Sequence, residues 1–187
     1  PKSSVEGGDL QAYHTHPGVL VASGSELAAS FVFANNGPGD APGAVVQATI
    51  SEQVTPIALT CSARLGAMCP QLSITDPTQL AQALRLGIAV PSLPAGGFLV
   101  YELRGRAPTV RGDTTAEVKF GATITPPAFR QGPAGGAMEG PVDQYLDNNT
   151  TYLSSTIVRD PIGCSTAPSV NKIELPAQSE SQNAAYL

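Results

Sequence analysis

Apolar and polar residues alternate along most of this chain with a period of two, the spacing of a β-strand that has one buried face. The clearest run covers residues 25–34 and places four apolar residues on one face: Leu27, Ala29, Phe31 and Phe33. Turn-forming residues follow at 35–40, Asn-Asn-Gly-Pro-Gly-Asp, where Asn and Gly tolerate positive φ and Pro fixes φ. With the β-rich run at 43–51, the pattern predicts a strand, a sharp turn and a second strand.

The same alternation continues on both sides of this strand–turn–strand segment. It predicts further strands within these segments: 9–16, 54–61, 92–107 after an opening turn, 114–124 and 150–158. The residues expected to point inward in two of them are Leu99, Tyr101 and Leu103, and Ala116, Val118, Phe120, Ala122 and Ile124. Pro56 cannot donate a ladder hydrogen bond, so its strand belongs at a sheet edge or a kink. Seven to nine short strands with frequent turns indicate an all-β fold, an immunoglobulin-like antiparallel β-sandwich.

One segment, residues 75–87, has the features of a helix. Thr75 or Asp76 can cap it, Pro77 suits the first helical position, and Leu80 and Leu84 have helical spacing. A strand from 84 to 90 is the rival interpretation. Both can hold in sequence, as one helical turn followed by a strand.

The segments outside the strands define the expected organisation. Residues 1–8 form an N-terminal arm, 9–158 the sandwich, and 159–187 a tail that is either a linker or a donated strand. Residues 126–146 are a long loop rich in Gly and Pro. The chain starts at Pro1 without a basic or apolar leader, so we expect either a removed signal peptide or an internal fragment.

Composition narrows the classes of partner. The chain contains 19 Gly and 17 Pro, close to a fifth of its 187 residues, whereas the usual combined share is about 12%. The formal net charge is −5 and Lys and Arg do not cluster, which argues against nucleic-acid binding. No apolar run approaches the roughly 18 residues of a membrane-spanning helix. The low share of charged residues, 13%, is common in extracellular β proteins.

The chain has three cysteines. Cys61 and Cys69 have the spacing of a local disulfide across a hairpin or loop, although two buried thiols in a reducing cell would give the same sequence. Cys164 is then left as a free thiol, an intermolecular bridge, or a partner of a cysteine outside this chain.

Candidate chemistry is sparse. The nucleophile-elbow, zinc-protease, phosphate-loop and dinucleotide-binding motifs are all absent, so we expect no enzyme. Oxygen donors gather before the last strand at Asp143, Asp147, Asn148 and Asn149, the ligand type that Ca²⁺ favours. Such side chains also hold turns by bonding backbone N–H groups, and no other cofactor is expected.

Four landmarks in order give the chain a family resemblance: NNGPGDAPGAVV, TCSARLGAMCP, SLPAGGFLVYELRGRA and DNNTTYLSSTIV. Over about residues 25–158 it resembles the immunoglobulin-like repeat called domain-of-unknown-function eleven, a module of bacterial cell-surface and secreted proteins. The resemblance implies a structural or adhesive role without catalytic residues. The loop at 126–146 and the segment at 74–84 are longer than in that family, and the tail from 159 lies outside it.

These observations lead to two functional hypotheses. The first is a structural module of a bacterial cell-surface or extracellular assembly, an adhesin stalk or a filament subunit that packs against its neighbours. A terminal arm could donate a strand, and the candidate donor residues are Val170, Ile173 and Leu175. The second is a module that binds a glycan or host protein through loop 126–146, with the candidate residues Phe129, Arg130 and Tyr145.

Overall fold

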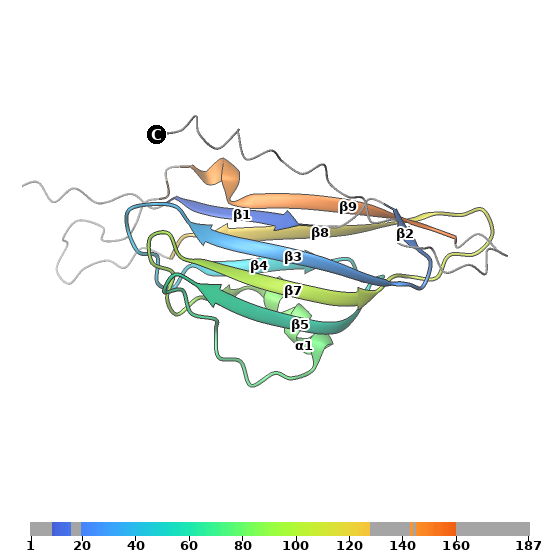
Figure 1. Cartoon of the computed structure of the whole chain (residues 1–187), viewed down its shortest axis with the longest axis horizontal. Coiled ribbons are helices and arrows are strands. Elements are labelled where there is room, and N and C mark those ends of the chain that lie inside the picture. The colour runs from blue at the N-terminus through green and yellow to red at the C-terminus, as the bar shows by residue number, and fades with distance from the viewer. Residues whose placement is uncertain (1–8, 16–19, 128–142, 144, 160–187) are drawn as a thin grey trace, which may run out of the picture.

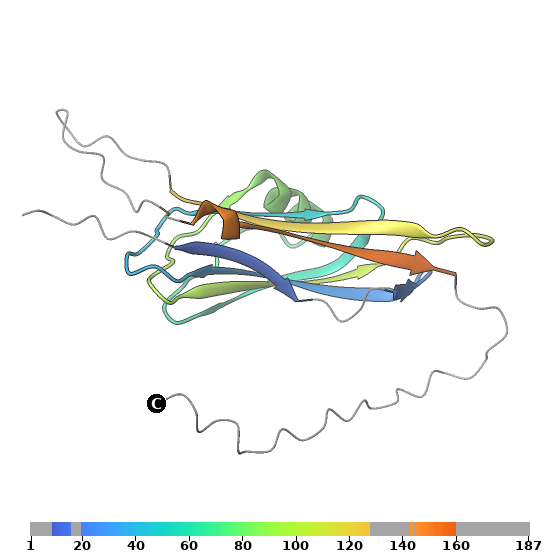
Figure 2. The ribbon, with the colours of Figure 1, turned by 90° about the horizontal axis from the view of Figure 1, so that it is seen from above.

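The structure is a computed structural model, and it describes residues 9–15, 20–127, 143 and 145–159. Its strands form two sheets that face each other (Figures 1 and 2). One sheet has the order β1-β3-β7-β5, with the bounds Leu10–Thr15, Glu26–Asn35, Phe98–Arg106 and Thr55–Arg64. The other has the order β2-β9-β8-β4-β6, with the bounds Leu20–Ala22, Thr150–Val158, Ala116–Thr125, Val45–Ile50 and Ile88–Ala89.

This strand order is that of an immunoglobulin sandwich. Lettered A to G along the chain, β1, β3, β7 and β5 are strands A, B, E and D, and β9, β8 and β4 are strands G, F and C. The first part of the chain changes sheets, because β1 pairs antiparallel with β3 whereas β2 pairs parallel with β9. The expected all-β sandwich is therefore confirmed.

The core lies between the sheets and consists of the side chains that alternation placed inward. Phe31 and Phe33 of β3 are fully buried, and so is Leu99 of β7. The rings of Phe31 and Phe120 pack across the two sheets with centroids 6.4 Å apart. Burying one such side chain contributes roughly 1.5–3 kcal/mol, so these residues supply much of the stability. Ala116, at the start of β8, is only partly buried.

The helix α1, Pro77–Leu86, lies within the segment 75–87 that the sequence predicted as helical, and it is longer than a single turn. Asp76 caps it by accepting a 2.8 Å hydrogen bond from the backbone N–H of Gln79, and Pro77 starts it. Gly87 ends it with φ +106, a conformation that side chains rarely adopt. The rival strand is reduced to β6, because Leu84 is buried as part of the helix. The helix closes the side of the sandwich where β4 and β5 face each other (Figure 1).

Strand β5 is the last strand of its sheet, as expected from Pro56. Its pairing with β7 shifts register between Pro56 and Ala58, which marks a local irregularity at the proline. The strand runs on to Arg64, three residues beyond the segment that alternation predicted. One long strand of this sheet is therefore paired on one side only among the described residues.

Candidate functional site

Asp143 is the centre of the predicted oxygen cluster, and it is buried. Its Oδ2 accepts hydrogen bonds from the backbone N–H of Leu10, at 3.3 Å, and from Nδ2 of Asn149, at 2.7 Å. Its Oδ1 accepts from the backbone N–H of Tyr145 at 3.0 Å. The carboxylate thus joins the start of β1 to the short 3₁₀ helix η1, Leu146–Asn148, and the start of β9. This role is the structural alternative that the sequence left open.

Two of the remaining oxygen donors, Asp147 and Asn148, line a pocket of about 620 Å³ beside Asp143. Nδ2 of Asn148 donates a 2.8 Å hydrogen bond to Oδ1 of Asp9, a residue that the sequence did not connect with this loop. Asp147 is exposed at the pocket edge. Within the part of the chain that the structure describes, no group of three or more His, Cys, Asp or Glu residues is arranged to hold a metal ion.

Two buried amide oxygens of this cluster are unsatisfied. Oδ1 of Asn148 and Oδ1 of Asn149 have no hydrogen-bond partner among the described residues. Buried polar atoms are nearly always paired, and amide oxygen is a ligand for Ca²⁺. Calcium binding at Asp143, Asp147, Asn148 and Asn149 therefore stays a prediction to be tested.

The first landmark turn is held by its own side chains. Asn35 is fully buried, and its Nδ2 donates hydrogen bonds to the carbonyls of Gly39, at 2.8 Å, and Leu93, at 3.0 Å. Oδ1 of Asp40 accepts from the backbone N–H of Ala95 at 3.0 Å. The NNGPGD and LPAGG segments therefore lie side by side, and their polar side chains stabilise the turns.

A disulfide joins Cys61 of β5 to Cys69 in the loop that follows, with the two Cα atoms 6.1 Å apart. It fixes this loop to the outermost strand of the sheet. Cys164, the third cysteine, lies outside the described residues.

The two predicted interaction segments are only partly visible. Phe129 and Arg130 of the ligand loop lie outside the described residues. Tyr145, the third residue of that set, is 62% exposed, and the neighbouring Leu146 is 65% exposed. The candidate strand donor lies outside the described residues in full: Val170, Ile173 and Leu175.

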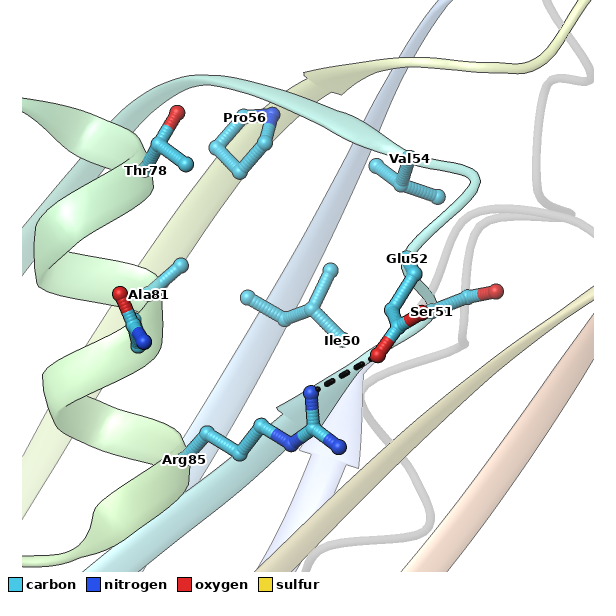
Figure 3. Close-up of a pocket in the computed structure, with 9 residues that line it drawn as sticks. Ile50, Ser51, Glu52, Val54, Pro56, Thr78, Ala81 and Arg85 are labelled. Atoms are coloured by element: carbon cyan, nitrogen blue, oxygen red, sulfur yellow. Dashed lines mark hydrogen bonds and ion pairs between the residues drawn. The ribbon is translucent and has the colours of Figure 1, made fainter.

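A pocket of about 270 Å³ lies between α1 and the turn from β4 to β5 (Figure 3). Ile50, Val54 and Ala81 supply apolar lining, and Nη1 of Arg85 forms a 3.0 Å ion pair with Oε1 of Glu52 across its mouth. Glu52 and Arg85, the charged residues of its lining, are therefore paired with each other. The sequence hinted at this place only through the long segment at 74–84.

Tyr101 carries a perturbed titratable group, and it belongs to the core. Burial raises the pKa of its hydroxyl to about 12, because the phenolate would lose its hydration. The ring packs edge-on against Phe33 at 5.9 Å, and the hydroxyl oxygen has no partner among the described residues. A neutral phenol enclosed in the core has no access to a substrate.

Comparisons with known proteins give distant similarities. No protein-family model matches the sequence, so membership of the domain-of-unknown-function eleven family is not confirmed, and no curated protein matches it either. The fold is similar to the CARDB domain of the PF1109 protein from Pyrococcus furiosus, a crystal structure in complex with di-metal ions, at 15% identity and TM-score 0.48. That match covers 84% of this chain and 100% of the domain.

Two further solved structures match this chain at lower identities and TM-scores. The collagen-binding domain of a Staphylococcus aureus adhesin matches at 10% identity and TM-score 0.34, covering 79% of this chain and 96% of that one. AvmM, which catalyses macrocyclization in alchivemycin A biosynthesis, matches at 10% identity and TM-score 0.41, covering 83% and 92%. A fold does not by itself determine a function, so the function of this chain has to be argued from its own residues.

Proposed function

We propose that this chain is a non-catalytic structural module of a bacterial cell-surface or extracellular assembly, in which it packs against neighbouring modules or copies of itself. The observation that carries the proposal is the position of the start of β1 and of the end of β9. Nδ2 of Asn148 binds Asp9, so the described chain begins beside the start of β9. The last described residue of the chain is Arg159, directly after the end of β9.

Strand β9 has 9 residues and therefore spans about 30 Å. The start of β1 and the end of β9 consequently lie at opposite ends of the long axis of the sandwich (Figure 1). When modules of this kind are joined end to end, each one adds its full length to the assembly. This geometry is the one that a stalk or a filament requires.

The same geometry determines how the module would carry force. A load that separates Asp9 from Arg159 pulls β1 along β3 and β9 along β8, which are antiparallel pairs. Strands loaded along their length must break many ladder hydrogen bonds together, whereas peeled strands break them one at a time. The buried links from Asp143 to Leu10 and Asn149 hold the loaded start of β1 to the start of β9, the end of that strand that lies away from Arg159.

Neighbouring copies could join by strand donation, the sharper form of the proposal. The support is the edge of β5, which is paired with β7 alone among the described strands. An unpaired edge accepts an incoming strand through main-chain hydrogen bonds. Pro56 removes a donor at one end of this edge, so the part after the proline is the acceptor that we expect.

Electron microscopy of the native material tests the structural proposal, which expects filaments or stalks and is contradicted by isolated particles. For strand donation, the full chain is compared with a chain lacking residues 165–187 and with one in which these residues are replaced by Gly and Ser at equal length. Both variants should fail to assemble in analytical ultracentrifugation. A truncated chain that polymerises unchanged rules out donation from the tail.

The alternative function is ligand binding through loop 126–146. The exposed Tyr145 and Leu146 favour it, since they place an aromatic and an apolar side chain together at one end of the sandwich. A glycan array and a panel of host matrix proteins test it with the full chain and the Tyr145→Ala variant. A loss of binding in the variant supports this site, and an array without hits contradicts its glycan form.

A further inference from the structure

The outer face of the five-stranded sheet carries an unusual aromatic side chain. Tyr152 of β9 is 78% exposed, although it lies in the middle of a strand. Its direct neighbour on β8 is Gly121. Gly121 is buried on a face where the flanking positions of β8 are open to solvent or half-buried. The tyrosine ring covers the glycine.

A side chain at position 121 would crowd the ring of Tyr152, which would have to shift to accommodate it. A Cβ added to Gly121 would come within 3.1 Å of both Cδ1 and Cε1 of Tyr152. Glycine weakens a strand interior and is typical of places where another group approaches the backbone closely. One side of the ring is therefore supported by backbone, and the other side is free for a ligand.

Polar groups flank the ring along both strands. Toward one end lie Lys119 and Ser154, which are opposite each other, followed by Glu117. Toward the other end lie Thr123 and Thr150, whose hydroxyl oxygens are 3.2 Å apart. A shallow pocket of about 410 Å³ adjoins the ring and includes Glu117, Lys119 and Ser154 in its lining.

The charges at this place cancel. Nζ of Lys119 is 3.4 Å from Oε2 of Glu117, and both side chains are more than half exposed. A site with one paired acid and base has no preference for an anion or a cation, so its charge complement is a neutral ligand. The paired groups and the hydroxyls supply both donors and acceptors of hydrogen bonds.

From these features we infer that Tyr152 and its surroundings bind a neutral polysaccharide. A sugar ring has an apolar C–H face that stacks on an aromatic ring and hydroxyl groups at its rim that bond to flanking polar groups. Tyrosine provides a rigid contact with an apolar body and a polar tip. The site is open rather than enclosed, so it suits a chain of sugars that crosses several strands and not a free monosaccharide. This inference is independent of the proposed packing role, since the site lies on a sheet face and not at the ends.

The test measures binding of the full chain to insoluble cellulose, chitin, starch and β-1,3-glucan by depletion from solution. We expect at least one of these neutral polysaccharides to bind, and Tyr152→Ala to lower that affinity by about tenfold, as truncation of an aromatic anchor does. Tyr152→Phe should retain binding because it keeps the ring. Tyr13→Ala is the matched control, an exposed tyrosine on β1 of the other sheet, and should bind like the unmodified chain.

Substitution of Gly121, which the ring of Tyr152 covers, gives a second, independent variant. Gly121→Val places a side chain where the ring lies, so it should displace the ring and weaken binding while circular dichroism shows an intact fold. Binding to none of the four polysaccharides, or equal binding by Tyr152→Ala, overturns the inference. So does stronger binding to an anionic polysaccharide such as alginate. A Tyr152→Ala chain that changes only in self-association, by sedimentation, also overturns it and identifies the ring as a contact between copies.

Discussion

Nδ2 of Asn35 donates a 3.0 Å hydrogen bond to the backbone carbonyl of Leu93, a residue 58 positions away in the sequence. The backbone joins the same two segments, because the N–H of Asn35 donates to the carbonyl of Gly97 and the N–H of Gly96 donates to the carbonyl of Asn35. A fully buried amide thus fastens the turn after β3 to the turn before β7. The NNGPGD turn therefore has a structural role, because it holds two distant segments of the chain together.

Replacing Asn35 with Ala should lower the free energy of unfolding by about 3 kcal/mol. The substitution removes the side-chain partners of the Gly39 carbonyl and the Gly37 N–H, and each unsatisfied buried group costs about 1–3 kcal/mol. The Leu93 carbonyl loses one of two donors and keeps the N–H of Ala41. Urea denaturation measures the change. Asn36→Ala is the control, because Asn36 is exposed and its side chain binds only Gln11 in the hydrogen bonds seen here, so its effect should stay below about 0.5 kcal/mol. Equal effects of the two variants would contradict the role given to Asn35.

Asp143→Ala should destabilise the fold by about 2–4 kcal/mol, since a buried carboxylate that accepts three hydrogen bonds is lost. Hydrogen exchange should show the loss first at the amide of Leu10, where β1 starts. The exposed Asp147 provides the matched variant Asp147→Ala, which is expected to leave both stability and exchange close to the unmodified values. Unchanged exchange at Leu10 in Asp143→Ala would count against the link to β1.

Calcium provides a separate measurement on the same cluster. If the unpaired amide oxygens of Asn148 and Asn149 coordinate Ca²⁺, then 1,000-fold excess of Ca²⁺ over its Kd stabilises the chain by about 4 kcal/mol. The melting temperature should then rise by several degrees, and a chelator should reverse the rise. Identical melting with Ca²⁺ and with chelator would show that the cluster is a structural hydrogen-bond network and nothing more.

Loss of the Cys61–Cys69 disulfide should cost about 2.5 kcal/mol, the chain-entropy value for a loop of this length. The double variant Cys61→Ala, Cys69→Ala is compared with the unmodified chain in denaturant, with and without dithiothreitol. Reductant should destabilise the unmodified chain and leave the double variant unaffected. A reductant effect of equal size in both would assign the effect to another part of the chain.

Tyr101→Phe should be neutral or stabilising by up to about 1 kcal/mol at pH 7, because it removes a buried hydroxyl oxygen that has no partner among the described residues. At high pH the difference should grow. Burial raises the pKa of Tyr101 from 10.0 to about 12, so the unfolded chain ionises first and stability falls between these two values. Tyr101→Phe lacks this contribution and should lose less stability from pH 10 to 12. Parallel pH profiles of stability for the unmodified chain and Tyr101→Phe would contradict this role of the Tyr101 hydroxyl.

Local pattern was sufficient for the strands and for the faces that they bury. Phe31, Phe33 and Phe120 alternate with polar or small neighbours, and period two follows from the backbone of any strand, wherever its partner lies. The helix was placed correctly for the same reason, since Asp76 and Pro77 act within one turn. Packing alone decided between helix and strand at Leu84, because this position fits a buried strand and a buried helix equally well.

Pairing between distant residues was decided by the tertiary structure alone. Asp9 meets Asn148 across 139 positions and Asn35 meets Leu93 across 58, because the sandwich brings loops together at its ends. Gly121 and Tyr152 are 31 positions apart in the sequence, and the register of β8 against β9 places the ring of one over the backbone of the other. Alternation is a property of a single strand and is written in its sequence. Register and strand order depend on which strands meet, and only the folded sandwich determines that.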